Sequence, residues 1–163
     1  MRAGTAHVDL SERRHDLRHD VPVPFATDPT AGYGVDPVDT VAAAGRADLG
    51  TVVNSRAIQC ALSRVCGLCG LSLSGPPTFV GSAAEADTNT FRFPPMHRDC
   101  ADYALRTFTG LGVPVLGQQI VLTGWELVVT GGFELERPTR RGPDMHVCFH
   151  PNSVVERRTV SIG

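Results

Sequence analysis

Hydrophobic residues recur with a helical period in two stretches of the chain, residues 54–65 and residues 96–108. The apolar side of the first stretch consists of Ile58, Ala61, Leu62 and Val65. The apolar side of the second consists of Ala101, Ala104, Leu105 and Phe108. Charged and polar residues fill the opposite sides. This spacing predicts two short amphipathic helices, and either Asn54 or Ser55 is expected to cap the first one.

The rest of the chain after residue 70 has the pattern of β-strands. Residues 119–130 form a long apolar run rich in Val, Leu and Ile around Trp125. Further strands are predicted at residues 133–136, 144–150 and 154–162. Two shorter alternating runs, residues 71–73 and 91–93, are expected to pair as a hairpin around a polar connection at residues 81–89.

The first fifty residues are poor in large apolar side chains, and acidic residues outnumber arginines there. A helical period is interrupted by Pro22, Pro24, Pro29 and Pro37. Because such a composition buries little surface, residues 1–50 are predicted to be a mobile or loosely docked arm. Only residues 21–25 are expected to lie extended against the body. Residues 51–163 are predicted to form a single domain.

Composition sets limits on the partners. The formal net charge is −2 and 42 % of the residues are hydrophobic, which suits one domain with a modest core. This charge gives no global attraction to nucleic acid or to an anionic membrane, so such binding would need a local patch. The chain has no long apolar run and no signal-peptide pattern, and a cytoplasmic location is expected. Its five cysteines, an odd number, then favour metal ligation over disulfides.

Four residues have the types and the spacing of a zinc site: Cys66, Cys69, His97 and Cys100. Glycines beside the first two cysteines allow a tight knuckle, and the last two ligands fall in the first turn of the second predicted helix. Four protein ligands close a tetrahedral site, so one zinc ion per chain is expected to stabilise the fold and not to catalyse. The predicted fold class is therefore α+β. A treble-clef-like core of helix, zinc knuckle, hairpin and helix is followed by an antiparallel β segment.

These motifs also carry a resemblance. Residues 55–70, with their C-x2-C-G knuckle, and residues 94–104, with P-P-x-H-x2-C-A, resemble a group of small treble-clef-like zinc-binding proteins of actinobacteria and their phages. The resemblance extends from about residue 54 onward, with a weaker likeness at residues 21–27. It implies the zinc core and a Trp-containing β tail, but it implies no function. HNH nucleases have a similar frame, yet residues 71–93 lack the histidine that their catalysis requires.

One predicted strand offers a second place for chemistry. His146, Cys148 and His150 share one face of it, with Asp144 at its start and Glu134 or Glu136 expected nearby. These residues suit an open metal site or a cysteine nucleophile beside a histidine base. The alternative is a solvated polar face whose apolar side packs inward.

The remaining candidates are a cysteine and several arginines. Cys60 lies between Arg56 and Arg64, which would make it reactive, or it is a small buried side chain packed against the arm. A basic patch for phosphates is predicted from Arg137, Arg140, Arg141, Arg157 and Arg158, and a solvated turn is the alternative.

Two functions follow from these observations. The first is a zinc-stabilised, non-catalytic interaction module, accessory or regulatory, that binds a protein or nucleic acid or associates with itself. The arginines at 56, 64, 137, 140 and 141 are its candidate contacts for nucleic acid. The alternative is a small enzyme of a secondary-metabolite or modification pathway that uses the face with His146, Cys148 and His150. A deep pocket beside His146 would favour the enzyme.

Overall fold

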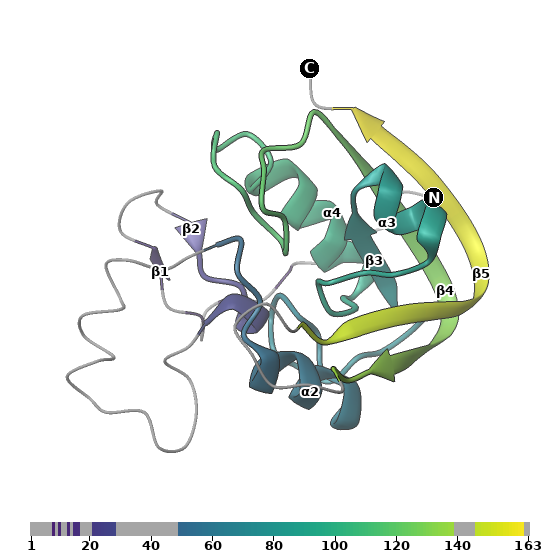
Figure 1. Ribbon diagram of the computed structural model, residues 1–163. Coiled ribbons are helices and arrows are strands. Elements are labelled where there is room, and N and C mark those ends of the chain that lie inside the picture. Colours follow the sequence, from purple (N-terminus) through teal and green to yellow (C-terminus); the bar gives the residue numbers. More distant parts are fainter. Residues whose placement is uncertain are drawn as a thin grey trace, which may run out of the picture.

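The computed structural model describes residues 8, 10, 13, 15–16, 21–28, 49–138 and 146–161. In chain order the elements are β1 (His15–Asp16), β2 (Val21–Pro22), η1 (Phe25–Thr27), α2 (Asn54–Leu62), β3 (Thr78–Gly81), α3 (Ala83–Thr88), α4 (Arg98–Thr107), β4 (Gly124–Glu136) and β5 (Cys148–Ser161). The fold is thus mixed α+β, as predicted (Figure 1). No helix in the described ranges is long and apolar enough to cross a membrane.

A three-stranded antiparallel sheet in the order β3-β4-β5 forms the frame of the body. The hairpin of β4 and β5 runs from the Gly124–Ser161 pair to the Glu136–Cys148 pair, with an irregularity between Val129 and Thr130. The predicted runs before and after Gly131 therefore join into one strand, β4, and the two predicted C-terminal strands join into β5.

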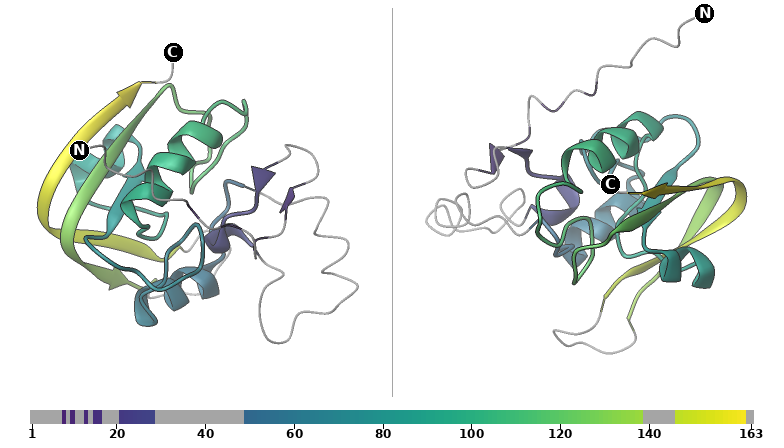
Figure 2. Two further views of the ribbon diagram at one scale, coloured as in Figure 1. Left: turned by 180° about the vertical axis from the view of Figure 1, so that it is seen from behind. Right: turned by 90° about the horizontal axis from the view of Figure 1, so that it is seen from above.

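The helices α3 and α4 lie over opposite faces of this sheet (Figure 2). Neighbouring side chains of β5 establish this, because successive residues of a strand point to opposite faces. Arg157 forms an ion pair with Asp87 of α3, whereas Arg158 forms one with Asp102 of α4. The apolar side of α4 is buried as the sequence predicted, so α4 covers the larger core.

Two hydrophobic clusters make up the core. The larger one joins α4 and the cysteine knuckle to Trp125, Leu127 and Val129 of β4. The smaller one is aromatic and includes Phe79, Phe91, Phe149 and Ala57 of α2. The ring centroids of Phe79 and Phe91 lie 5.3 Å apart. The knuckle therefore belongs to the larger cluster, and α2 packs against the smaller, aromatic one.

The predicted hairpin of residues 71–73 and 91–93 is wrong. Ser72 instead bridges Val65 within the knuckle, and Phe91 bridges Phe149 of β5. The region predicted as a polar connection holds the end of β3 and the helix α3, which begins with a capping box of Ser82 and Glu85. Apolar runs of three residues carry too little pattern to select a pairing partner, and longer-range packing decides it.

The buried side of α2 also differs from the prediction. Arg56 and Cys60 are buried, while Leu62 is 67 % exposed. The reason is that η1 of the N-terminal segment packs on α2 and covers the side that the sequence left for solvent. No side chain caps α2, and the Asn54 carboxamide oxygen accepts a hydrogen bond from the Val147 amide instead.

Residues 21–28 pack on the body as part of its core. The amides of Phe25 and Ala26 donate to the carbonyl oxygens of Leu68 and Gly67 at 3.0 and 2.9 Å. Val23 and Ala26 are fully buried. The division of the chain at residue 50 remains a prediction, but within its first part this segment is a layer over the knuckle.

Candidate metal centre

Four side chains from two segments converge beside α4. One ligand atom from each of Cys66, Cys69, His97 and Cys100 lies within 4.8 Å of all the others. The first two come from the knuckle between α2 and β3. His97 is the residue before α4, and Cys100 stands in the first turn of that helix. Among the residues that the structure describes, this is the one such group, and its spacing is that of a Cys3His cluster able to hold a metal ion.

The spacing of the ligand atoms fits one tetrahedral ion. With metal–sulfur and metal–nitrogen bonds of about 2.3 and 2.05 Å, the sulfur–nitrogen edge of a tetrahedron is about 3.6 Å. The Nδ1 atom of His97 lies 3.5 Å from the Cys69 Sγ atom and 3.6 Å from the Cys100 Sγ atom. Both distances match the edge expected for two ligands of a shared cation.

The surroundings orient the ligands. The Nε2 atom of His97 lies 2.8 Å from the Ser72 carbonyl oxygen. A carbonyl oxygen can only accept, so Nε2 carries the proton and Nδ1 presents its lone pair to the sulfurs. The Leu68 amide donates to the Cys66 Sγ atom at 3.4 Å, as amides of a knuckle do toward a thiolate.

Knuckle geometry depends on Gly70. Its amide donates to the Cys66 carbonyl oxygen at 2.9 Å and closes the turn. Its φ angle is +75°, a conformation that glycine adopts without steric cost. A Cβ atom there would stand 2.7 Å from the ring of Phe25, so the knuckle and the N-terminal segment fit together only with glycine at this position.

The thiols of the cluster interact strongly. Burial by itself would raise the pKa of the Cys66 thiol, but hydrogen bonds from Cys100, Cys69 and backbone amides lower that pKa well below its ordinary value. The pKa of Cys100 is raised, first because Cys66 and Cys69 hold its proton in hydrogen bonds and then by burial. A divalent cation is the group that would let all three sulfurs ionise together.

One side of the cluster is open. A groove of about 350 Å³ is lined by Cys69, His97 and Cys100 together with apolar residues such as Leu71. Cys66 is nevertheless fully buried and Cys100 is 3 % exposed. All four tetrahedral positions are taken by the protein, so the arrangement can hold two chain segments together but offers no position for substrate.

The face with His146, Cys148 and His150 does alternate with a buried side formed by Val147 and Phe149. The three residues do not converge, however. The Nδ1 atom of His150 lies 2.9 Å from the Asn89 carbonyl oxygen, and its Nε2 atom lies 3.5 Å from Glu136. Both nitrogens of His150 thus have structural partners.

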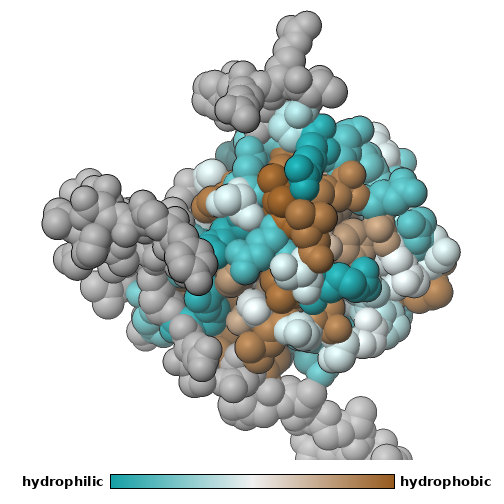
Figure 3. All heavy atoms as spheres, turned by 90° about the horizontal axis from the view of Figure 1, so that it is seen from below, coloured by the Kyte–Doolittle hydropathy of each residue, from teal (hydrophilic) through white to brown (hydrophobic). Residues whose placement is uncertain are grey.

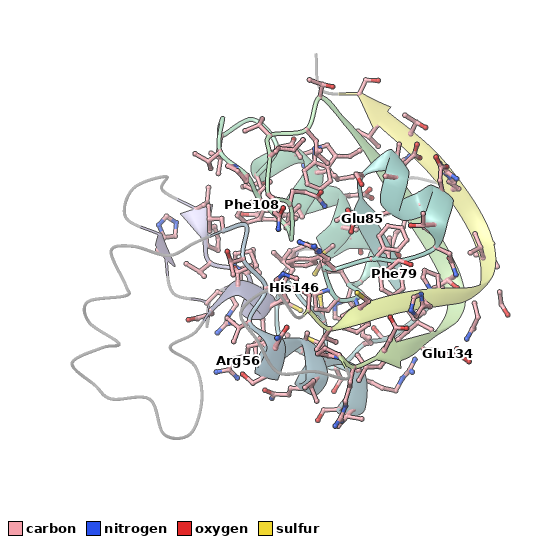
Figure 4. The ribbon with its side chains drawn as sticks, viewed as in Figure 1. Arg56, Phe79, Glu85, Phe108, Glu134 and His146 are labelled. Carbon is pink, nitrogen blue, oxygen red and sulfur yellow. The ribbon has the colours of Figure 1, made fainter. Side chains whose placement is uncertain are left out.

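The other members of this face are also poorly placed for catalysis. Burial, and then the carboxylate of Glu136, raise the pKa of the Cys148 thiol, which is opposite to the shift that a nucleophile needs. The cavity beside His146 measures about 50 Å³, which is too small for a substrate. Glu134 and Glu136 do lie beside this face, opposite His150 and Cys148 in the sheet, but Glu134 lies apart from His146 (Figure 4). Asp144 is outside the described residues.

Of the two alternatives for Cys60, the structure agrees with the small buried side chain and not with a reactive thiol between Arg56 and Arg64. Cys60 is fully buried, and burial raises its pKa strongly. The Arg56 guanidinium lies 5.0 Å from the centre of the Phe25 ring and donates to the Asp28 carbonyl oxygen. Arg64 stacks at 5.4 Å over the Phe133 ring. Arg140 and Arg141 are outside the described residues, and Arg137 is exposed.

Two parts of the metal centre were missed by the sequence analysis. The Ser72 carbonyl that orients His97 carries no side-chain signal, so no motif could reveal it. The contact between Phe25 and the knuckle had a weak signal, the lone apolar stretch at residues 21–25.

Comparisons of this chain with protein-family models, with curated proteins and with solved structures found no match. The resemblance to the actinobacterial and phage zinc-binding group therefore rests on the two motifs alone and stays a prediction.

Proposed function

We propose that this chain is a zinc-organised, non-catalytic module that binds a protein. The observation that carries the proposal is the closed Cys3His set, whose Nδ1 and Sγ atoms stand at tetrahedral spacing. Three thiolates and one imidazole in a tetrahedron suit zinc among the common cellular metals. The order of knuckle first and helix-borne ligands last is also that of a treble-clef finger. We infer one structural zinc ion per chain.

Zinc here would act on folding. Structural zinc sites in small peptides bind their metal with about 10–16 kcal/mol of apparent free energy. That energy is comparable with the stability of a whole domain, so the ion would join the knuckle, α4 and the N-terminal segment into one unit. No step of chemistry is needed to explain such a site.

The charges favour a protein partner over nucleic acid. Three arginines of the sheet and of α4 already have acidic partners. Arg98 pairs with Glu156 at 2.6 Å, Arg157 with Asp87 at 2.8 Å and Arg158 with Asp102 at 3.4 Å. Arg56, one of the predicted phosphate contacts, is buried. Apolar surface instead gathers on the side of the molecule where α2 lies (Figure 3), and Leu62 of that helix is largely exposed.

Elemental analysis tests the metal part of the proposal. The chain purified without chelator should carry one zinc per molecule, and Cys100→Ser should lose it together with the cooperative thermal transition. Cys148→Ser is the matched control, because this cysteine lies outside the cluster, and it should keep both. Wild-type protein without zinc, or a Cys100→Ser variant that melts like the wild type, would overturn the proposal.

A binding assay tests the choice of partner class. Labelled single-stranded and duplex oligonucleotides should show no saturable change in fluorescence anisotropy with the zinc-loaded chain at 150 mM salt. Salt-dependent binding of either oligonucleotide, lost in an Arg137→Glu variant, would move nucleic acid to first place.

A further inference from the structure

The outer edge of β5 is an open β-strand edge. In the part of the chain that the structure describes, β5 is paired along its length with β4 alone. The opposite edge of β5 is occupied only near the start of the strand. There Phe149 bridges Phe91, and the Pro151 carbonyl oxygen accepts a hydrogen bond from the Asn89 carboxamide. The later part of the strand forms the rim of the molecule (Figures 1 and 2). Its outward main-chain groups are available to a further strand.

A groove runs beside this edge. It has a volume of about 410 Å³ and lies between α4 and β5. Its lining consists of Asp102, Leu105, Arg106, Arg158 and Val160. The floor of the groove is formed by Leu105, which is 6 % exposed and belongs to the larger hydrophobic cluster. Val160 packs against the same cluster. A side chain from a strand added to β5 on this face would find an apolar floor next to it.

The charged residues of the groove determine which ligand side chains it favours. The groove carries two guanidinium groups and one carboxylate. The Asp102 carboxylate pairs with Arg158, whose Nη2 atom lies 3.4 Å from it, whereas Arg106 donates to the main-chain carbonyl oxygen of Asp102. Both Arg158 and Asp102 remain partly exposed, at 51 % and 41 % of their side-chain surface. The groove therefore keeps a net positive charge at the rim of an apolar floor.

We propose that the edge of β5 and this groove together bind an extended peptide of a partner protein, which adds to the sheet as a fourth strand. The peptide would pair its main chain with β5 after Asn152, place an apolar side chain over Leu105 and Val160, and place an acidic side chain beside Arg106 and Arg158. This is the strand-addition mode of peptide recognition, in which the main chain supplies affinity and alternate side chains supply specificity. The proposal rests on the protein-binding part of the proposed function and does not depend on which metal is bound.

An acidic partner fits this edge better than a second copy of the chain does. The exposed part of β5 carries Glu156, Arg157 and Arg158, so two such edges would meet with the same net positive charge. A nucleic acid strand would find the anionic Asp102 in the groove and no exposed aromatic ring among its lining residues.

The test starts from a phage-displayed library of random twelve-residue peptides, selected on the biotinylated, zinc-loaded full chain. The enriched peptides should alternate apolar and acidic residues. For the tightest synthetic peptide, Arg158→Glu and Arg106→Glu should each weaken binding about tenfold or more by fluorescence anisotropy. Arg157→Glu is the matched control, because it changes the adjacent residue on the opposite face of the same strand, and it should change the Kd by less than about twofold. Each variant is first checked for unchanged metal content and thermal midpoint.

Main-chain pairing has its own signature. N-methylation of single peptide amides should abolish binding at every second position and be tolerated between them, because alternate amides of an added strand point toward β5. Binding that shows no such alternation, that responds equally to Arg157→Glu, or that fails to emerge from the library would overturn the proposal. A chain that is dimeric in sedimentation and becomes monomeric with Glu156→Arg would overturn it in favour of a second copy. Metal content is read on the same samples, so a failure here is distinguishable from a failure of the zinc proposal.

Discussion

Removing the ring of Phe25 should destabilise the whole body, although this residue lies forty-one positions before the first cysteine of the metal cluster. Phe25 is 8 % exposed, and its ring packs on Gly70 and lies beneath the guanidinium groups of Arg13 and Arg56 at 5.4 and 5.0 Å. Truncation of a core phenylalanine costs about 3–5 kcal/mol, and loss of a cation–π contact adds about 0.5–1 kcal/mol. Since Phe25 lies at the border of the core, the lower end of the range for truncation of a phenylalanine applies. The expected loss for Phe25→Ala is about 3 kcal/mol.

The assay is thermal unfolding of the zinc-loaded chain. For a chain of this length each kcal/mol lowers the midpoint by about 2–4 °C, so the expected shift is about 6–12 °C. Leu62→Ala is the control, because Leu62 is exposed, and its midpoint should move by no more than about 2 °C. A Phe25→Ala protein that melts with the wild type would refute the role given to the N-terminal segment.

Three further outcomes are expected. Gly70→Ala should cost about 2 kcal/mol or more by chemical denaturation, and part of that cost should vanish in the Phe25→Ala background, because the clash with the ring is then gone. Glu85→Ala should cost about 2–3 kcal/mol, since its carboxylate accepts from two backbone amides and one glutamine side chain; a loss below 0.5 kcal/mol, on the order of a surface change, would contradict this. Because the pKa of Cys148 is raised, its thiol stays protonated at pH 7 and should react with iodoacetamide more slowly than the same cysteine in the unfolded chain. A fast reaction that disappears in His146→Ala would restore the enzyme hypothesis.

The sequence was most informative where a pattern of residues is compatible with few structures. Three cysteines and a histidine at zinc spacing predicted the cluster, because their shared chemistry is independent of the packing around them. The buried side of α4 followed from a ten-residue amphipathic helix whose period is long enough to be unambiguous. The alternation of Val147 and Phe149 with polar neighbours likewise predicted that these two side chains are buried where β5 begins.

Prediction failed where the partner of a segment decided its structure. Arg56 and Cys60 looked solvent-facing because nothing local shows that η1 covers them. The runs at 71–73 and 91–93 were each too short to specify a pairing, and contacts with distant segments determined it. Ser82 and Glu85 did contain a signal for α3, since a serine followed three residues later by a glutamate is the pattern of a capping box.

The strand order has a consequence for synthesis of the chain on the ribosome. The β-bridge partner of Phe91 is Phe149, far along the chain. The side chain of Asn54 likewise accepts a hydrogen bond from the Val147 amide, ninety-three residues later. Because such pairings close long loops, the body is expected to complete its folding only after nearly all of the chain has emerged. Until then Phe79 and Phe91 have no cover from β5, so nascent chains stalled before residue 148 should be clients of chaperones that recognise exposed aromatic segments.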